Sequence, residues 1–405
     1  MDPTSPAQTQ PTEEPLFRRR VFYIPGYDPI HPRRYRELYR KEGAEQARIT
    51  GYRLKLLPRK GGGPYGWRVL GEFGGPTTAE FEVLVWSDLV RASMQTGIPA
   101  TYLQLVRTAW AYIGTGALFR LMRLRKGPMI AALYPIGLLI LQLVVALAAG
   151  YALYRLGATL HPIFGLMAGL PIIPLILRTF RRHDNRLFAY YLMHDYAYSA
   201  QNGGANPPEL ETRLAEFGRR IRQAMAECDE VLVVGHSSGV HLAVSILSDM
   251  IRAGLPENRP ALALLTLGQV VPMVSFLPKA NRLRRDLAYL AARPEVTWVD
   301  VTAPGDGCAF ALCDPVSVTG VAPAGKLWPL VISAAFSQTL SPERWRELRW
   351  RFFRLHFQYL CAFDRPGDYD YFQITAGPLT LADRYRDRQP SKSRVETPLS
   401  PWRSL

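Results

Sequence analysis

The chain has 405 residues, 48% of them hydrophobic, and is therefore long enough for one full α/β domain with additional segments. Its 49 lysines and arginines exceed its 34 aspartates and glutamates, and the net charge of +15 favours an anionic partner, either nucleic acid or a phospholipid surface. The four cysteines have neither metal-site spacing nor the density of a secreted disulfide scaffold, so we expect free thiols in a reducing compartment and no metal centre.

Both ends of the chain are polar and contain several prolines. Residues 1–17 have no apolar core ahead of the arginines at 18–20, which argues against a secretory signal and favours a disordered tail. Residues 388–405 have a similar composition, and we expect a second disordered tail there.

Residues 18–99 have the pattern of the first part of an α/β domain. A short apolar strand at Val21–Ile24 is followed by a Pro-Gly turn and then by a helical pattern over 33–50. The stretches 52–59, 66–73 and 80–90 are β-like and are separated by glycine-rich turns.

Residues 100–186 carry the pattern of a membrane-associated segment. A helix over about 99–124 is expected to lie on the membrane surface. The 28 residues between Lys126 and Arg155, and the 22 between Arg155 and Arg178, include no charged side chain. Since about 20 such residues can cross a bilayer, we predict a transmembrane hairpin with spans at about 128–154 and 157–177.

Charge on either side of this hairpin predicts its orientation. Only Arg155 lies in the turn, whereas eight basic residues flank the two outer ends: Arg120, Arg123, Arg125, Lys126, Arg178, Arg181, Arg182 and Arg186. The positive-inside rule then predicts a multi-pass inner-membrane protein with two spans, whose soluble parts and termini are cytoplasmic. The chain has no nucleic-acid-binding motif, so the expected partner is the lipid bilayer and not nucleic acid.

Residues 187–387 predict the second part of the domain. A polar helix over 207–228 precedes an aliphatic strand, and the strands at 261–268 and 295–304 are separated by a charged helix at 279–294. Strands that alternate with helices favour a mostly parallel sheet covered by helices on both faces. Ligands bind such sheets at the carboxyl ends of the strands.

The stretch VLVVGHSSGVHLAV, residues 231–244, contains a Gly-x-Ser-x-Gly pattern between a predicted strand and a predicted helix. In that setting the serine, here Ser237, lies on a sharp turn with its hydroxyl exposed and is a candidate nucleophile. The alternative is a plain βα turn in which the serine caps the helix.

Four stretches in this order resemble the α/β-hydrolase superfamily: RVFYIPGYDP, VLVVGHSSGVHLAV, LALLTLG and VTWVDVTAPGDG. The resemblance covers about residues 18–86 and 186–360, with the hairpin inserted between them. Together with the predicted hairpin, it implies a membrane-anchored serine hydrolase that cleaves acyl esters, either lipids or other apolar esters, through an acyl-enzyme and without a cofactor. The alternative is a non-catalytic membrane scaffold of the same fold. The oligomeric state stays open.

The resemblance also implies a nucleophile, an acid and a histidine in that chain order. Only His241 and His356 follow Ser237, and His241 lies one turn into the next helix, so His356 is the expected base. Asp306, just after a predicted strand, is the expected acid, and Asp314 is the second candidate.

The same family pattern places two backbone N–H groups at the oxyanion. They are expected to be those of Ser238, directly after the nucleophile, and of Tyr27 in the turn PGYDP. The alternative for that turn is a tight turn with no functional role.

Overall fold

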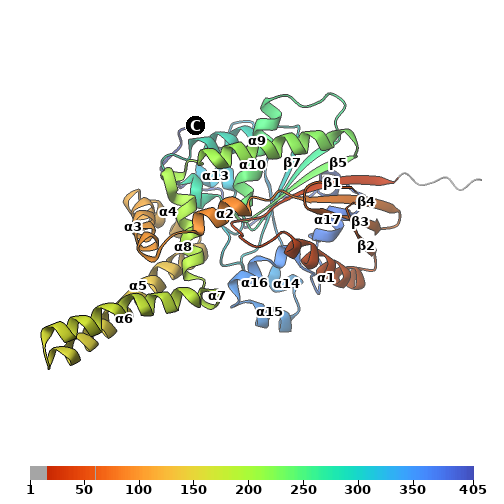
Figure 1. Ribbon diagram of the computed structural model, residues 1–405. Helices are drawn as coiled ribbons and strands as arrows, with labels where there is room; N and C mark the ends of the chain where they lie inside the picture. The colour runs from red at the N-terminus through yellow and green to blue at the C-terminus, as the bar shows by residue number, and fades with distance from the viewer. Residues whose placement is uncertain (1–15, 60) are drawn as a thin grey trace, which may run out of the picture.

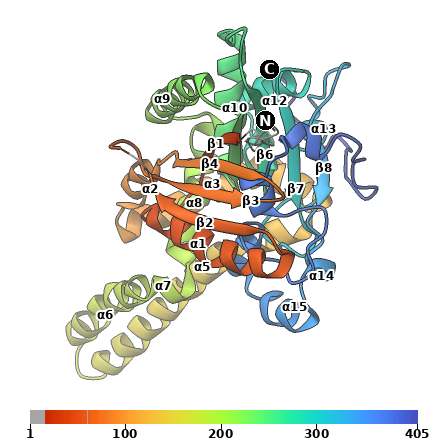
Figure 2. The same cartoon turned by 90° about the vertical axis from the view of Figure 1, so that its right-hand side faces the viewer.

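The computed structural model describes residues 16–59 and 61–405. Its centre is an eight-stranded sheet in the order β2-β3-β4-β1-β5-β6-β7-β8 (Figures 1 and 2). The strands are β1 (Phe17–Ile24), β2 (Arg53–Pro58), β3 (Gly66–Glu72), β4 (Pro76–Val83), β5 (Glu230–His236), β6 (Ala261–Leu267), β7 (Thr297–Thr302) and β8 (Leu330–Ser333). The pairs β2–β3 and β3–β4 are antiparallel, and all the other pairs are parallel. The predicted α/β class with a mostly parallel sheet and flanking helices is therefore confirmed.

Most of the helices flank this sheet, and loops connect them to its strands. They are α1 (Arg33–Thr50), α2 (Ser87–Met94), α3 (Ile98–Gly114), α4 (Ala117–Leu124), α5 (Lys126–Ala158), α6 (Pro162–Arg182), α7 (Asp184–Leu187), α8 (Ala189–Ala200), α9 (Pro208–Gln223), α10 (Gly239–Arg252), α11 (Pro272–Ser275), α12 (Asn281–Ala291), α13 (Pro315–Thr319), α14 (Phe336–Thr339), α15 (Pro342–Leu348), α16 (Phe352–His356), α17 (Tyr371–Ala376) and α18 (Leu381–Arg384). Short 3₁₀ turns are η1 (Gln201–Gly204), η2 (Ala224–Ala226) and η3 (Gln358–Leu360).

Alternate side chains of the central strands enter two separate cores, one on each face of the sheet. From β1, Val21 and Tyr23 pack on the same side as α1, whereas Phe22 and Ile24 pack with α9 and α10. Figure 1 shows α9 and α10 on one side of the sheet and α1 on the other. Every residue of β5 is buried, which explains its continuous run of aliphatic side chains.

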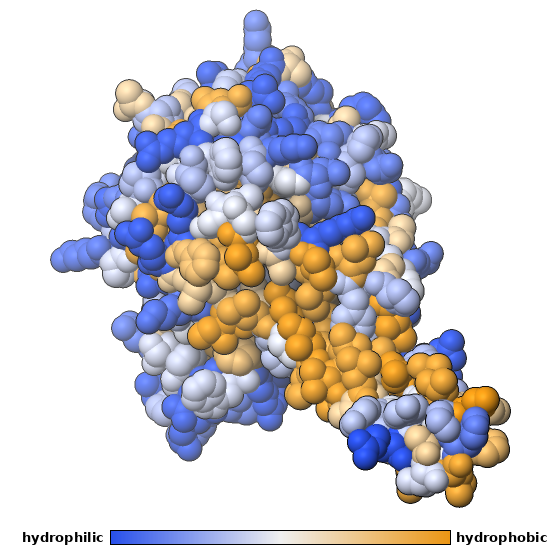
Figure 3. All heavy atoms as spheres, turned by 90° about the vertical axis from the view of Figure 1, so that its left-hand side faces the viewer, coloured by the Kyte–Doolittle hydropathy of each residue, from blue (hydrophilic) through white to orange (hydrophobic). Residues whose placement is uncertain are grey.

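Helices α5 and α6 form a hairpin that projects from the rest of the molecule (Figures 1 and 2). Both are long and apolar enough to cross a membrane, and only 22% and 17% of their apolar windows are buried. A core helix of a soluble protein would be mostly buried at this length. Figure 3 shows the hydrophobic surface of the hairpin continuing onto the adjoining face of the body. Exposed apolar surface of this extent is typical of a membrane or protein interface.

The two helices of the hairpin are held together by glycines. A Cβ added at Gly169 would lie 2.5 Å from the carbonyl oxygen of Gly150, and one at Gly157 would lie 2.9 Å from the Cα of Gly165. Gly165 and Gly169 are four residues apart on α6, the spacing that lets helix backbones approach closely in lipid.

The first half of α5 belongs to the body rather than to the free part of the hairpin. The Tyr102 hydroxyl of α3 donates to the Leu139 carbonyl of α5 at 3.0 Å, and Leu139 packs with Ala189 and Met193 of α8. The free part of α5, residues 140–158, extends about 28 Å at roughly 1.5 Å per residue. This length is close to the hydrocarbon thickness of a bilayer, about 30 Å.

Three segments differ from the sequence predictions. The helix predicted over 99–124 is divided into α3 and α4, because Gly116 takes a left-handed conformation with φ 71°. The β-like stretch 80–90 ends at Val83 and continues as α2. Strand β8 was not predicted, since three apolar residues and a serine are too few to show a period.

The C-terminal segment 388–405, predicted to be disordered, packs against the domain. Val395 exchanges backbone hydrogen bonds with the Leu312 carbonyl at 2.7 Å and the Asp314 N–H at 2.9 Å. The buried guanidinium of Arg284 donates to the Ser404 carbonyl at 2.8 Å. These contacts depend on partners far along the chain, which composition does not reveal. Most of the predicted N-terminal tail lies outside the described residues.

Substitution of Gly169 by leucine should destabilise the hairpin, because the new side chain meets the backbone of α5. We expect a loss of about 1–3 kcal/mol in the free energy of unfolding. Unfolding in detergent micelles titrated with a denaturing detergent measures this loss. The control is Gly137→Leu, at a glycine of α5 whose Cβ position has no atom within 4 Å. Equal losses for the two variants would contradict the packing described above.

Candidate active site

Ser237 occupies a sharp corner between β5 and α10. Its φ is 56°, a left-handed conformation that side chains other than glycine seldom adopt. Gly239 permits the corner, because a Cβ there would lie 2.3 Å from the carbonyl oxygen of Ile24. The Ser237 N–H donates to the Leu267 carbonyl of the neighbouring strand at 2.9 Å. The residue therefore lies at the carboxyl end of the central parallel strands, as predicted from its flanks.

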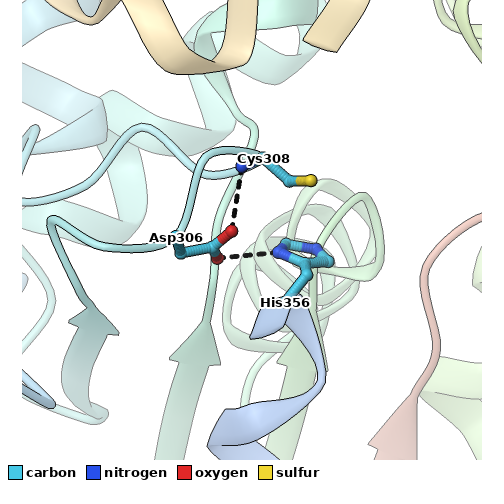
Figure 4. Close-up of side chains that lie close together, drawn as sticks. All are labelled: Asp306, Cys308 and His356. Carbon is cyan, nitrogen blue, oxygen red and sulfur yellow. Dashed lines mark hydrogen bonds and ion pairs between the residues drawn. The ribbon is translucent and has the colours of Figure 1, made fainter. Parts of the chain in front are cut away.

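Asp306, from a loop, and His356, from a short helix, form a buried pair (Figure 4). Asp306 follows β7, and His356 is the last residue of α16. Nδ1 of His356 lies 2.7 Å from Oδ2 of Asp306. Two further donors reach this carboxylate: the Cys308 N–H at 2.9 Å from Oδ1 and the Tyr359 hydroxyl at 3.0 Å from Oδ2.

These donors keep Asp306 ionised despite its burial. Burial by itself raises the pKa of the carboxyl, but the charge and hydrogen bond of His356 and the other two donors outweigh it and lower the pKa below its ordinary value. An ionised carboxylate only accepts hydrogen bonds, so we assign the Nδ1 proton to His356. Whenever the ring is neutral, Nε2 then carries the free lone pair and can accept a proton.

His356 lines the same cavity as Ser237, and its second ring nitrogen is Nε2. This buried atom has no hydrogen-bond partner among the residues that the structure describes. Ser237 and His356 both line one cavity of about 520 Å³. Within the described chain no hydrogen bond joins the Ser237 hydroxyl to Nε2, and such bonds are often long before substrate binds.

Two residues that the sequence did not single out position His356. Nε2–H of His236, the residue before Ser237, donates to the His356 carbonyl at 3.0 Å, and the two rings lie 4.9 Å apart. Burial, reinforced by the nearby His356, lowers the pKa of His236 to about 3, so it stays neutral. Gly268, with φ 55°, leaves room for the ring, since a Cβ there would lie 3.0 Å from Cε1 of His356.

Asp314, the second candidate acid, has a structural role. Its carboxylate accepts from the N–H groups of Val316 and Ser317, both at 3.0 Å, and so caps the start of α13. It also lies 2.5 Å from the Lys326 ammonium. The structure thus brings His356 together with Asp306, and it places Asp314 at the start of α13.

The two predicted oxyanion donors differ in their availability. The backbone N–H of Ser238 has no hydrogen-bond partner within the described residues. The Tyr27 N–H, in contrast, donates to the Ser238 hydroxyl at 2.8 Å. Tyr27 and Ser238 are thus adjacent as predicted, but the Tyr27 N–H is free for an oxyanion only when the Ser238 side chain turns away.

Asp195 of α8 also lines the cavity, and sequence reasoning missed it. Its carboxyl has no hydrogen-bond or ion-pair partner among residues 16–59 and 61–405, and burial raises its pKa to about 7 although His356 opposes the shift. It is the single acidic residue between Asp184 and Glu209, within the aromatic run YYLMHDYAY. An acid inside such a run was the signal that could have identified it.

Asp306, Cys308 and His356 also lie close enough to share a metal ion, with donor atoms within 4.8 Å of one another. Their chemistry favours a proton relay instead. Burial and the charge of Asp306 raise the pKa of the Cys308 thiol well above its ordinary value, and a protonated thiol is a poor ligand. The carboxylate and Nδ1 already bind each other. The donor set therefore does not fit a metal well.

The raised pKa of Asp195 predicts that Asp195→Asn increases the thermal stability of the protein by an amount that depends on pH. Burial of the carboxylate form lowers the free energy of unfolding. This loss is absent below pH 3.8, the ordinary pKa of the group, grows as the pH rises to about 7, and is constant above that. The melting temperature in detergent should therefore rise more at pH 8 than at pH 5. Asp387→Asn, at an exposed position, is the control. A larger gain at pH 5 would refute the assignment.

Comparison with known proteins finds no family model, no curated protein and no solved structure that matches this chain. What the protein does must therefore follow from the chemistry of its own side chains.

Proposed function

We propose that the protein is a membrane-anchored serine hydrolase of the α/β-hydrolase type that cleaves acyl esters through an acyl-enzyme. The observation that carries the proposal is the buried 2.7 Å contact between Asp306 and Nδ1 of His356, a residue that lines the same cavity as Ser237 and whose Nε2 has no partner among the described residues. A hydroxyl, a base and an orienting acid in this arrangement are the requirements of nucleophilic acyl transfer.

The order of the three residues along the fold also supports the proposal. Ser237 follows β5, Asp306 follows β7 and His356 follows β8, which is the chain order of the α/β-hydrolases. The strained corner at Ser237 agrees with the nucleophile turn of that family. One departure is that His356 ends the short helix α16 rather than lying on an open loop.

In the proposed reaction, the Ser237 hydroxyl attacks the ester carbonyl while Nε2 of His356 takes its proton. Asp306 stabilises the imidazolium that forms, and the Ser238 N–H stabilises the negative charge on the carbonyl oxygen. His356 then returns the proton to the leaving alcohol, and the acyl group stays on Ser237. A water molecule, activated by the same base, releases the acid and restores the serine.

The contacts between the site and the hairpin favour a lipid or another apolar ester as substrate. Gly127, in the first turn of α5, lies against Gly307 next to the acid, and Pro128 lines the cavity. The Arg125 guanidinium donates to the Ala311 carbonyl at 2.7 Å. The loop that contains Asp306 thus contacts the N-terminal end of α5, the proposed membrane helix.

The second candidate function is a membrane scaffold that has kept the fold without turnover. The hydrogen bond from the Tyr27 N–H to the Ser238 hydroxyl favours it, because that donor is not free for an oxyanion in this state.

The hydrolase proposal predicts the ranking of four single variants and one double variant by their kcat on a soluble model ester. Ser237→Ala and His356→Ala should each lower kcat by roughly 10⁴-fold or more, and the double variant should be little worse, because the residues act as a unit. Asp306→Asn should lower kcat roughly 10⁴-fold, because the amide lacks the negative charge that fixes the Nδ1–H tautomer and stabilises the imidazolium. Asp314→Asn should leave kcat nearly unchanged after correction for folded protein. A larger kcat loss from Asp314→Asn than from Asp306→Asn would exclude the proposed relay.

We also propose that the hairpin crosses the inner membrane with both soluble parts in the cytoplasm. Eight basic residues flank its outer ends, while Arg155 is exposed near the tip of α5. A charge at that place can reach the far surface, whereas at mid-bilayer it would cost at least about 2.5 kcal/mol.

Cysteine labelling in intact cells tests this topology in a variant that lacks the native thiols. Leu160, 82% exposed in the turn of the hairpin, should react as cysteine with an impermeant reagent from outside. Glu209→Cys, at an exposed position on α9, should react only after the cells are opened. Labelling of position 209 from outside would refute the cytoplasmic assignment.

A further inference from the structure

A second and larger cavity adjoins the catalytic one. Its volume is about 1480 Å³, which exceeds the roughly 300–1,000 Å³ of common small-molecule pockets. The two cavities share lining residues, among them Arg34, Phe188, Tyr196, Cys308 and Phe353. We call the larger cavity the membrane-side groove, because the first turns of α5 form part of its wall.

Two parts of the wall of the membrane-side groove are apolar. Ile130, Ala131 and Tyr134 of α5 line it on the hairpin side, and Phe352 and Phe353 line it from α16. Ile130 is 65% exposed, so this side of α5 is open. The hydrophobic surface of the hairpin runs without a break onto the body in Figure 3. An acyl chain can therefore pass from lipid along α5 without crossing a polar surface.

Phe188 and Phe353 mark the boundary between the two cavities. Their rings lie 5.2 Å apart, and both residues line the catalytic cavity as well as the membrane-side groove. Phe188 takes the left-handed conformation, φ 55°, at the junction of α7 and α8. An acyl chain that extends from the membrane-side groove to Ser237 would pass between or beside these two phenyl rings.

The membrane-side groove carries an excess of positive charge. Seven of its lining residues are basic: Arg34, Arg40, Lys41, Arg186, Arg344, Arg351 and Arg354. Three are acidic: Glu37, Glu42 and Glu347. The lining thus has four more basic than acidic residues, and Asp28, 3.2 Å from Arg34, and Asp364, 3.1 Å from Arg344, lie outside the lining and reduce this excess to two. Glu347 is shared between Arg351 at 2.9 Å and Arg354 at 3.5 Å, so this arginine pair is only half neutralised.

From these observations we infer that the membrane-side groove binds an anionic glycerophospholipid taken from the bilayer. Its phosphate lies among the arginines, and one acyl chain extends past Phe188 and Phe353 toward Ser237. The assignment of this lipid as the substrate rests on the proposed hydrolase function, whereas its binding does not. Apolar walls beside a basic rim fit a charged headgroup with long chains better than they fit a small neutral ester.

Photocrosslinking tests the binding independently of turnover. Full-length Ser237→Ala protein is placed in nanodiscs of phosphatidylcholine that contain phosphatidylglycerol with a diazirine in one acyl chain. We expect adducts on peptides of α5 near Ala131 and of α16, and a loss of about tenfold for Arg351→Gln with Arg354→Gln. Arg346→Gln, at an exposed arginine outside the groove, is the control and should change nothing. Adducts confined to the free part of the hairpin, or equal labelling by a phosphatidylcholine probe, would overturn the inference.

Cleavage rates of two esters distinguish a substitution that affects the membrane-side groove from one that affects the catalytic residues. Ala131→Trp fills the groove and should lower cleavage of phosphatidylglycerol in the nanodisc about tenfold, with a short soluble ester changed less than about twofold. Leu133→Trp, on the same helix but outside the groove lining, is the matched control. Equal losses on both esters for Ala131→Trp would contradict the proposed route. If wild-type protein cleaves neither ester, the hydrolase proposal fails, and the crosslinking result still decides whether the lipid binds.

Discussion

The hydrogen bond between Asp306 and Nδ1 of His356 is the interaction on which the rest of the site depends. Asp306 is buried, and a buried carboxylate is stable only where donors surround it. The Cys308 N–H, the Tyr359 hydroxyl and the imidazole provide those donors. In return the carboxylate fixes which ring nitrogen carries the proton. The ability of Nε2 to act as a base therefore depends on the hydrogen bonds that stabilise the Asp306 carboxylate.

Asp306 and His356 also contact other parts of the fold. His236 ties the end of β5 to the backbone of His356, so the strand that delivers Ser237 also holds the base. On the other side, the Asp306 loop rests on the first turn of α5 through Gly307 and Gly127. A single helix thus begins beside the proposed catalytic acid and continues into the segment long enough to cross a membrane. The proposed substrate route uses this continuity.

Local patterns were sufficient to predict the fold class, helix α1, the corner at Ser237 and the presence of two long apolar helices. Each depends on periodicity or on residues adjacent in sequence. Strand β8 and the packed segment 388–405 were missed, because their partners lie far along the chain. In the site, the resemblance to the α/β-hydrolases led us to predict Asp306 and His356 as partners. It could not reveal that His236 and Gly268 position the ring, that Asp195 faces the cavity, or that the Tyr27 N–H is engaged by Ser238. Those depend on side-chain contacts formed only in the folded state.

The most direct test of the central claim is the site of covalent modification by a fluorophosphonate, located by mass spectrometry on the full-length protein in detergent. This reagent traps a serine whose hydroxyl is activated by a neighbouring base. The proposed mechanism predicts one phosphonylated residue, Ser237, in the peptide that spans β5 and α10, and a severe loss of this adduct in His356→Ala. No adduct on Ser237, or an adduct that forms equally fast in His356→Ala, would contradict the mechanism and favour the non-catalytic scaffold.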